Sequence, residues 1–130
     1  MKFLLLLYGD ETQWMDMSPE DMKQSVEVWN AFGQELVDSG AIVAGEALAP
    51  TAEAITMRFD QGELVRTDGP FAETREQLGG FYLLECKDIE EASAWAAKVP
   101  DLGEGGCVEV RPIVDWVAAA EAAAAEATKA

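Results

Sequence analysis

FLLLLY, the run from Phe3 to Tyr8, is apolar at almost every position. A strand with one face in water alternates apolar and polar residues, so a continuous apolar run is typical of a strand covered on both faces. The run GFYLLEC, from Gly80 to Cys86, has the same character. Both stretches are therefore predicted to be strands inside a sheet.

A capped helix is expected after the first of these strands. Ser18 is suited to the N-cap, with Pro19 in the first helical position and Asp21 in the third. Gly40 is suited to end the helix, and AIVAGE, Ala41 to Glu46, is predicted to be a short strand. The apolar residues of the helix recur at helical spacing: Met22, Val26, Trp29, Phe32 and Leu36.

The second apolar strand begins a similar unit. Asp88 is suited to cap a helix in which Glu91 occupies the third position, and Pro100 closes that helix. CVEVRPIV, Cys107 to Val114, supplies the closing strand. Two such units with antiparallel pairing predict an α+β fold of the ferredoxin-like, split βαβ kind. Its strand order, 4-1-3-2, makes the two apolar strands central neighbours.

An inserted β-hairpin is predicted between the two units. AITMRF (Ala54–Phe59) and ELVRT (Glu63–Thr67) alternate polar and apolar residues on either side of a turn at residues 60–62. Arg58 and Arg66 on this hairpin are expected to be surface charges.

The second face of the sheet also needs a cover. The two helices occupy one face only, yet the central strands are apolar on both sides. The same sheet of another copy would cover the second face, so we expect a homodimer. The predicted strand order also places one strand between Cys86 and Cys107, a separation of about 9–10 Å that excludes a disulfide.

The composition excludes several kinds of function. The chain has 130 residues, which favours one domain, and its 9 basic and 25 acidic residues give a formal charge of −16. That charge opposes nucleic-acid binding. The absence of histidine excludes catalytic triads and imidazole metal sites. Because the sequence also has no cysteine cluster and no phosphate-binding loop, we expect no metal and no tightly bound organic cofactor.

Localisation and domain limits follow from the two ends of the sequence. The apolar N-terminal run is shorter than the core of a secretory signal and no small-residue cleavage site follows it, so we expect a cytoplasmic protein that does not bind membranes. Residues 1–116 are expected to form the α+β domain. Residues 117–130, an Ala-rich tail, are expected to be helical or frayed.

Four segments carry a family resemblance: LLLLYGDE near the start, GEALAP, TDGPFAETREQLGGFYLLE, and VEVRPI near the end. With them, the chain resembles the DGPF branch of the YciI-like (YCII-related) family from Met1 to about Trp116. The resemblance implies a dimeric α+β barrel of two ferredoxin-like subunits. Such relatives are largely uncharacterised, and many are encoded near extracytoplasmic-function sigma factors. A His–Asp pair is suspected to be catalytic in relatives, and this chain has no histidine to match it.

Asp68 is the candidate catalytic residue. An ordinary Asx turn is blocked there, because the amide two residues on belongs to Pro70, which has no N–H. Two interpretations remain open: the carboxylate caps the amide of Phe71 or Ala72, or it faces a pocket as a base or charge partner. Phe71 is expected to fill part of the core and to border the ligand pocket.

Four further residues are candidates for ligand binding. Glu73 and Arg75 belong to a mixed-charge cluster that either forms surface or dimer-rim ion pairs or lines the pocket. Arg111 alternates with valines on the last strand, so it faces the open side of the sheet if the valines lie under the helices. There it either holds an anionic substrate or pairs with an acid such as Glu109. Tyr8 ends the first strand beside that face, where its hydroxyl either enters the cavity or meets water.

Two functions remain open at this stage. The first is a small-molecule pocket near the sheet–sheet interface, in a binding protein or a cofactor-independent enzyme of unknown reaction, with Asp68, Tyr8 and Arg111 as polar groups. The alternative is a non-catalytic accessory or sensor protein in an extracytoplasmic-function sigma factor circuit. The acidic surface would complement a basic sigma factor.

Overall fold

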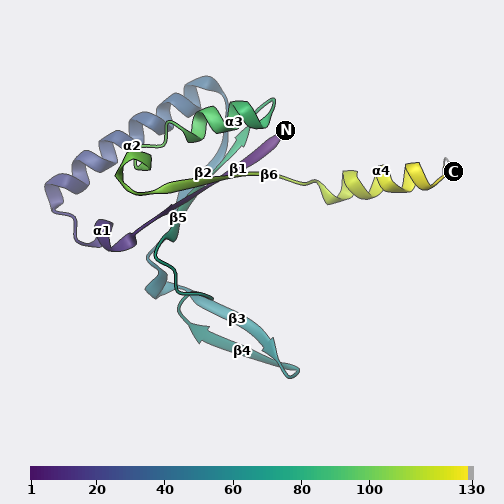
Figure 1. Cartoon of the computed structure of the whole chain (residues 1–130), viewed down its shortest axis with the longest axis horizontal. Helices are drawn as coiled ribbons and strands as arrows, with labels where there is room; N and C mark the ends of the chain where they lie inside the picture. The colour runs from purple at the N-terminus through teal and green to yellow at the C-terminus, as the bar shows by residue number, and fades with distance from the viewer. Residues whose placement is uncertain (129–130) are drawn as a thin grey trace.

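The computed structural model describes residues 1–128 and has an α+β fold with antiparallel sheets (Figure 1). The main sheet has four strands, in the order β2 (Ile42–Ala47), β5 (Gln77–Glu85), β1 (Lys2–Gly9) and β6 (Cys107–Pro112). β1 pairs antiparallel with both β5 and β6. The two apolar strands are therefore central neighbours, as predicted. Cys86 and Cys107 are free thiols, which confirms the prediction that they form no disulfide.

Two capped helices, α2 (Pro19–Ser39) and α3 (Ile89–Ala96), lie over the same face of this sheet (Figure 1). The side chains of Ser18 and Asp88 each accept a hydrogen bond from the amide three residues later, at 3.1 and 2.9 Å. α2 ends at Gly40, whose φ of 78° is left-handed and costs glycine little. The two predicted N-caps and the predicted end at Gly40 are confirmed, whereas α3 ends at Ala96, before the Pro100 that was expected to close it.

The hydrophobic core lies between these helices and the sheet. Val108 and Val110 of β6 pack against it, so Glu109 and Arg111, which alternate with them, lie on the other face. No helix within residues 1–128 lies over that other face (Figure 1). The buried residues of the core are Phe3, Leu5, Phe32, Leu36, Ala41, Leu84, Cys86, Ala92, Ala96 and Val99.

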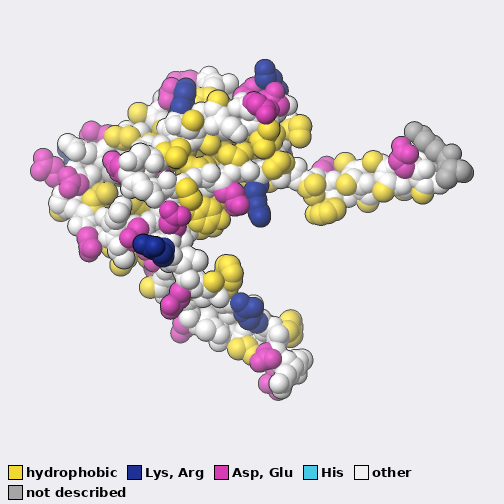
Figure 2. Space-filling model, viewed as in Figure 1, with side chains coloured by type: hydrophobic (Ala, Val, Ile, Leu, Met, Phe, Trp, Pro, Cys, Tyr) yellow, Lys and Arg dark blue, Asp and Glu magenta, His cyan; other side chains and the backbone are white. Residues whose placement is uncertain are grey.

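A second sheet consists of the hairpin β3 (Ile55–Asp60) and β4 (Glu63–Asp68), which projects from the body (Figure 1). Gln61 and Gly62 make the turn with φ angles of 51° and 82°, as a tight hairpin requires. The inserted hairpin predicted from the sequence is therefore confirmed. Hydrophobic side chains are exposed along it (Figure 2), including Phe59 at 77%.

The expectation that Phe71 fills the core is wrong. Its side chain is 78% exposed. The segment that carries it leaves the projecting hairpin, so Phe71 lies outside the contact between the helices and the main sheet (Figure 1). Arg58 and Arg66 on the hairpin are exposed, as predicted.

Four further elements complete the described chain: α1 (Glu11–Met15), the 3₁₀ turns η1 (Thr51–Glu53) and η2 (Leu102–Glu104), and α4 (Trp116–Thr128). α4 points away from the body, and all of its side chains are exposed (Figure 1). The tail is thus helical as far as Thr128, and the expectation for residues 129 and 130 lies outside the described residues. No helix in the part of the chain that the structure describes is both long and apolar enough to span a bilayer.

Candidate functional site

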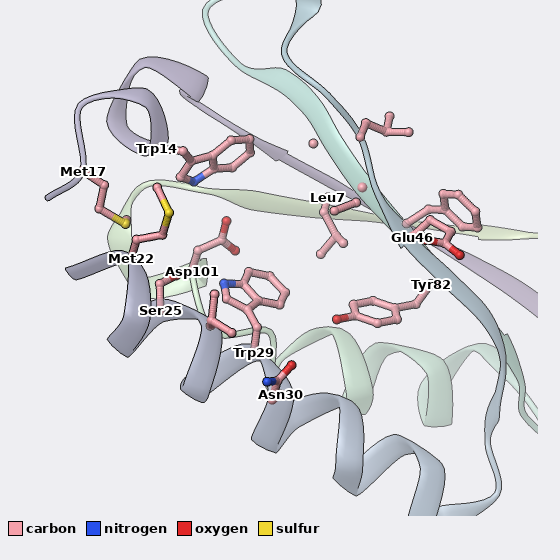
Figure 3. Close-up of a pocket in the computed structure, with 17 residues that line it drawn as sticks. Leu7, Trp14, Met17, Met22, Ser25, Trp29, Asn30, Glu46, Tyr82 and Asp101 are labelled. Carbon is pink, nitrogen blue, oxygen red and sulfur yellow. The ribbon is translucent and has the colours of Figure 1, made fainter. Parts of the chain in front are cut away.

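A cavity of 460 Å³ lies between the first half of α2 and the β2–β5 side of the sheet (Figure 3). We call it the first cavity. Trp14, Trp29 and Tyr82 form aromatic walls, and Asp101 contributes a carboxyl group. The other residues that line it are mostly apolar: Leu7, Met17, Met22, Ser25, Val26, Asn30, Glu46, Ala47, Leu48 and Phe81.

The apolar stripe of α2 explains the position of this cavity. Phe32 and Leu36, in the second half of the helix, are buried against the sheet. Met22 and Val26, in the first half, are 50% and 52% exposed and line the cavity. The stripe therefore continues beyond the closely packed part of the helix and leaves apolar surface that a ligand can cover.

Phe32 fixes two of the aromatic walls by edge-to-face contacts. Its ring centroid lies 6.4 Å from that of Trp29 and 5.5 Å from that of Tyr82, at interplanar angles of 85° and 75°. Each such pair stabilises by about 0.5–1.5 kcal/mol beyond its buried area. These two walls are consequently anchored in the core and are formed without a ligand.

Trp14, the third wall, is positioned by hydrogen bonds around α1. The carboxylate of Asp10 caps this helix by accepting a hydrogen bond from the amide two residues later, at 3.0 Å. The carboxylate of Glu11 accepts hydrogen bonds from the amide of Thr51, at 3.0 Å, and from its hydroxyl. The side-chain oxygen of Gln77 accepts one from the Glu11 amide at 3.0 Å. α1 is thereby tied to η1 and to β5.

Asp101 lies between the indole rings of Trp14 and Trp29 (Figure 3). Its Oδ1 atom is enclosed and accepts no hydrogen bond from any residue of the described chain. Its Oδ2 atom lies 2.9 Å from the position that a Cβ on Gly106 would occupy. Glycine at position 106 therefore leaves the room that the carboxyl group needs.

Burial is the main cause that raises the pKa of Asp101 above the ordinary 3.8. A hydrogen bond from its own amide opposes this shift, and the charge of Glu104 adds to it. Burial also raises the pKa of Tyr82, with the charge of Asp101 as the second cause. A buried acceptor without a donor lowers the stability of the folded protein by about 1–3 kcal/mol. A ligand that donates a hydrogen bond to Asp101 would remove this cost.

A second cavity, of 510 Å³, adjoins the first and shares Trp14, Trp29 and Asp101 with it. Further carboxylates line this second cavity: Asp10, Asp16, Asp21 and Glu104. No lysine or arginine of the described chain lines either cavity. Within residues 1–128, no group of three or more His, Cys, Asp or Glu side chains is arranged to hold a metal ion. The combined site is aromatic and apolar at one end and acidic at the other.

Comparison with known proteins identifies the family of the chain that carries this site. A family model for the YCII-related domain matches residues 1–117. The chain belongs to the YCII-related family. The curated "Uncharacterized protein R00369" of Rhizobium meliloti (strain 1021) is 36% identical over 114 residues, which are 87% of this chain and 92% of that protein. Every residue that lines the first two cavities lies within the YCII-related domain.

Three of the residues predicted from the sequence lie on the open face of this YCII-related domain. Tyr8 and Arg75 both line a third cavity, of 810 Å³, together with Glu109. The Tyr8 hydroxyl donates to Oε1 of Glu109 at 3.5 Å, and Nε of Arg111 lies 3.6 Å from the same oxygen. The structure therefore brings Tyr8 and Arg111 together at Glu109, and Arg75 lines the same cavity as Tyr8 and Glu109. Arg111 is paired with an acid, as one of its two interpretations expected.

The other predicted residues, Asp68, Phe71 and Glu73, line none of these three cavities. Asp68 is the last residue of β4, and its exposed carboxylate accepts no hydrogen bond from residues 1–128. The predicted cap of the following amides is therefore not formed. Glu73 is likewise exposed.

The residues of the first cavity were not predicted as site residues. Trp29 falls at the spacing of a core residue, and Tyr82 lies within an apolar strand. Asp101 follows the helix-closing Pro100, where an aspartate is an ordinary turn residue. One signal was available: Asp10 followed by Glu11 is a typical helix start, and that helix carries Trp14.

Proposed function

We propose that this YCII-related protein binds a small, largely apolar molecule in the first cavity, where Asp101 is the polar group that orients it. The enclosed Oδ1 atom of Asp101, an acceptor without a donor inside an aromatic cavity, is the observation that carries the proposal. The volume of 460 Å³ agrees with ligand pockets, which are typically about 300–1,000 Å³. A carboxyl group with a raised pKa can also transfer a proton to or from such a ligand.

A cavity-filling substitution tests the proposal. Val26 lines the first cavity, whereas Val37 lies on the same helix, is similarly exposed (52% and 56%) and lines none of the three cavities. Val26→Phe is expected to weaken the binding of neutral aromatic probes such as naphthylmethanol at least about tenfold, and Val37→Phe to leave it unchanged. Ligand-observed NMR measures both affinities. Equal binding by the two variants, or no binding of any probe to the unmodified protein, would contradict the proposal.

We also propose that the subunit has the ferredoxin-like, split βαβ arrangement, belongs to the DGPF branch and forms a homodimeric α+β barrel through its open sheet face. The strand order β2-β5-β1-β6 supports the first part, and the Asp68–Phe71 segment supports the second. For the third, half-buried apolar residues lie on the uncovered face: Leu4, Leu6, Phe81 and Leu83. Light scattering is expected to give twice the chain mass of 14.1 kDa, and the mass of one chain over a wide concentration range would exclude the dimer.

A further inference from the structure

The charges around the first cavity restrict what it can bind. Asp101 supplies a carboxyl group to it, and the adjoining second cavity adds further carboxylates. No lysine or arginine within residues 1–128 lines either cavity, so an anionic ligand would find no opposite charge there. The formal charge of −16 on the whole chain also repels anions and attracts cations. A neutral or cationic ligand is therefore favoured.

The aromatic rings favour a cationic ligand over a neutral one. Trp14, Trp29 and Tyr82 come from three different elements, and the two indole rings lie on either side of the carboxyl group of Asp101 (Figure 3). The face of an aromatic ring attracts a cation, most strongly in the case of tryptophan, and the attraction increases when the cation is removed from water. The indole rings provide the apolar contact that a hydrophobic ammonium ion needs, and the carboxylate between them provides the opposite charge.

Asp101 supplies a hydrogen-bond acceptor for the ligand. Its Oδ1 atom has no hydrogen-bond donor in the described chain. A protonated amine carries N–H donors, and hydrogen bonds between charged groups are stronger than those between neutral ones. An alcohol would also supply a donor but would leave the carboxylate charge uncompensated.

We infer that the first cavity takes a hydrophobic organic cation, a protonated amine whose apolar body lies against Trp14, Trp29 and Met22 and whose ammonium group lies against Asp101. The inference rests on the proposed function, because it names the chemical class of the ligand for the same cavity. The amine needs no metal or second cofactor, since its own N–H groups and positive charge provide the recognition.

Three probes with the same ring system but different charge test this inference: naphthylmethylamine, naphthylmethanol and naphthoate. By isothermal titration calorimetry, the amine is expected to bind at least about tenfold more tightly than the alcohol, and naphthoate most weakly. The measurement is repeated at an ionic strength of about 1 M, where the Debye length falls to about 3 Å and non-specific attraction to the acidic surface is screened. The preference for the amine is expected to persist there.

Asp101→Asn is expected to remove the preference for the amine, because the uncharged amide oxygen can still accept a hydrogen bond from naphthylmethanol but carries no charge to pair with the ammonium group. Asp60→Asn makes the same chemical change at an exposed position on the hairpin, lines none of the three cavities and is expected to keep the preference. If naphthylmethanol binds and the amine has no advantage in the unmodified protein, the inference is overturned and the proposed function stands. Tighter binding of naphthoate overturns it equally. If no probe binds, the proposed function fails as well.

Discussion

The indole ring of Trp14 lies directly on the backbone of Gly79. A Cβ atom at position 79 would be 2.3 Å from Cη2 of that ring, far closer than the about 3.5–4.0 Å at which carbon atoms normally meet. The wall that Trp14 contributes to the first cavity therefore requires glycine at this point of β5.

Gly79→Ala is expected to displace Trp14 and to lower the free energy of unfolding by about 1–3 kcal/mol, the usual cost of overpacking. It is also expected to weaken binding of naphthylmethanol. Gly33→Ala is the control, because no atom lies within 4 Å of its added Cβ and the residue is inside α2. That change is expected to stabilise by about 0.5–1 kcal/mol. Urea unfolding measures both, and a Gly79→Ala protein as stable as the original would show that Trp14 is not held there.

A second prediction concerns Phe32, which contacts Trp29, Tyr82 and Trp95 by its ring edge or face. Phe32→Ala is expected to destabilise the protein by about 3–5 kcal/mol, because the side chain is 4% exposed and its removal leaves a cavity. Phe59→Ala on the projecting hairpin is expected to cost less than about 1 kcal/mol, since only a cross-strand contact is lost. Similar losses for the two variants in urea unfolding would contradict this account of the core.

The elements of the fold were predictable where the signal is local. Ser18 and Asp88 cap their helices by bonds to amides three residues away, and residues 60–62 turn the hairpin within a few residues. The continuous apolar composition of Phe3–Tyr8 and Gly80–Cys86 identifies the middle of the sheet, because such runs are typical of central strands. Each of these inferences needs only a short window of sequence.

The candidate site was not predictable by the same reasoning, because it is assembled from distant segments. Asp101 becomes enclosed only when Trp14 and Trp29 are brought to it by α1 and α2. The Thr67–Glu85 segment attracted attention for Asp68, yet besides Tyr82 it contributes to the first cavity through Gln77, which holds α1, and Gly79, on which the ring of Trp14 lies. Nothing in the local pattern distinguishes these two roles.

A third prediction concerns the effect of Asp101 on stability at different pH. Its folded-state pKa is raised above 3.8, so the folded protein binds more protons than the unfolded chain between 3.8 and the raised value. The contribution of Asp101 to stability is therefore present below that interval and is lost as the pH rises through it. Asp101→Asn, which has no such proton to lose, is expected to gain stability relative to the unmodified protein over the same interval. Urea unfolding at a series of pH values measures the difference, and a difference that is constant or decreases would contradict it.

The last prediction concerns Tyr82, whose pKa is raised first by burial and then by the charge of Asp101. Asp101→Asn removes that charge and keeps most of the burial, so it is expected to lower the pKa of Tyr82 without returning it to 10.0. The chain has two tyrosines, and Tyr8→Phe leaves Tyr82 as the single source of the tyrosinate absorbance. The titration is therefore followed by ultraviolet absorbance in that background, with Asp60→Asn as the matched control. An unchanged Tyr82 titration in Asp101→Asn would mean that the two side chains do not interact across the first cavity.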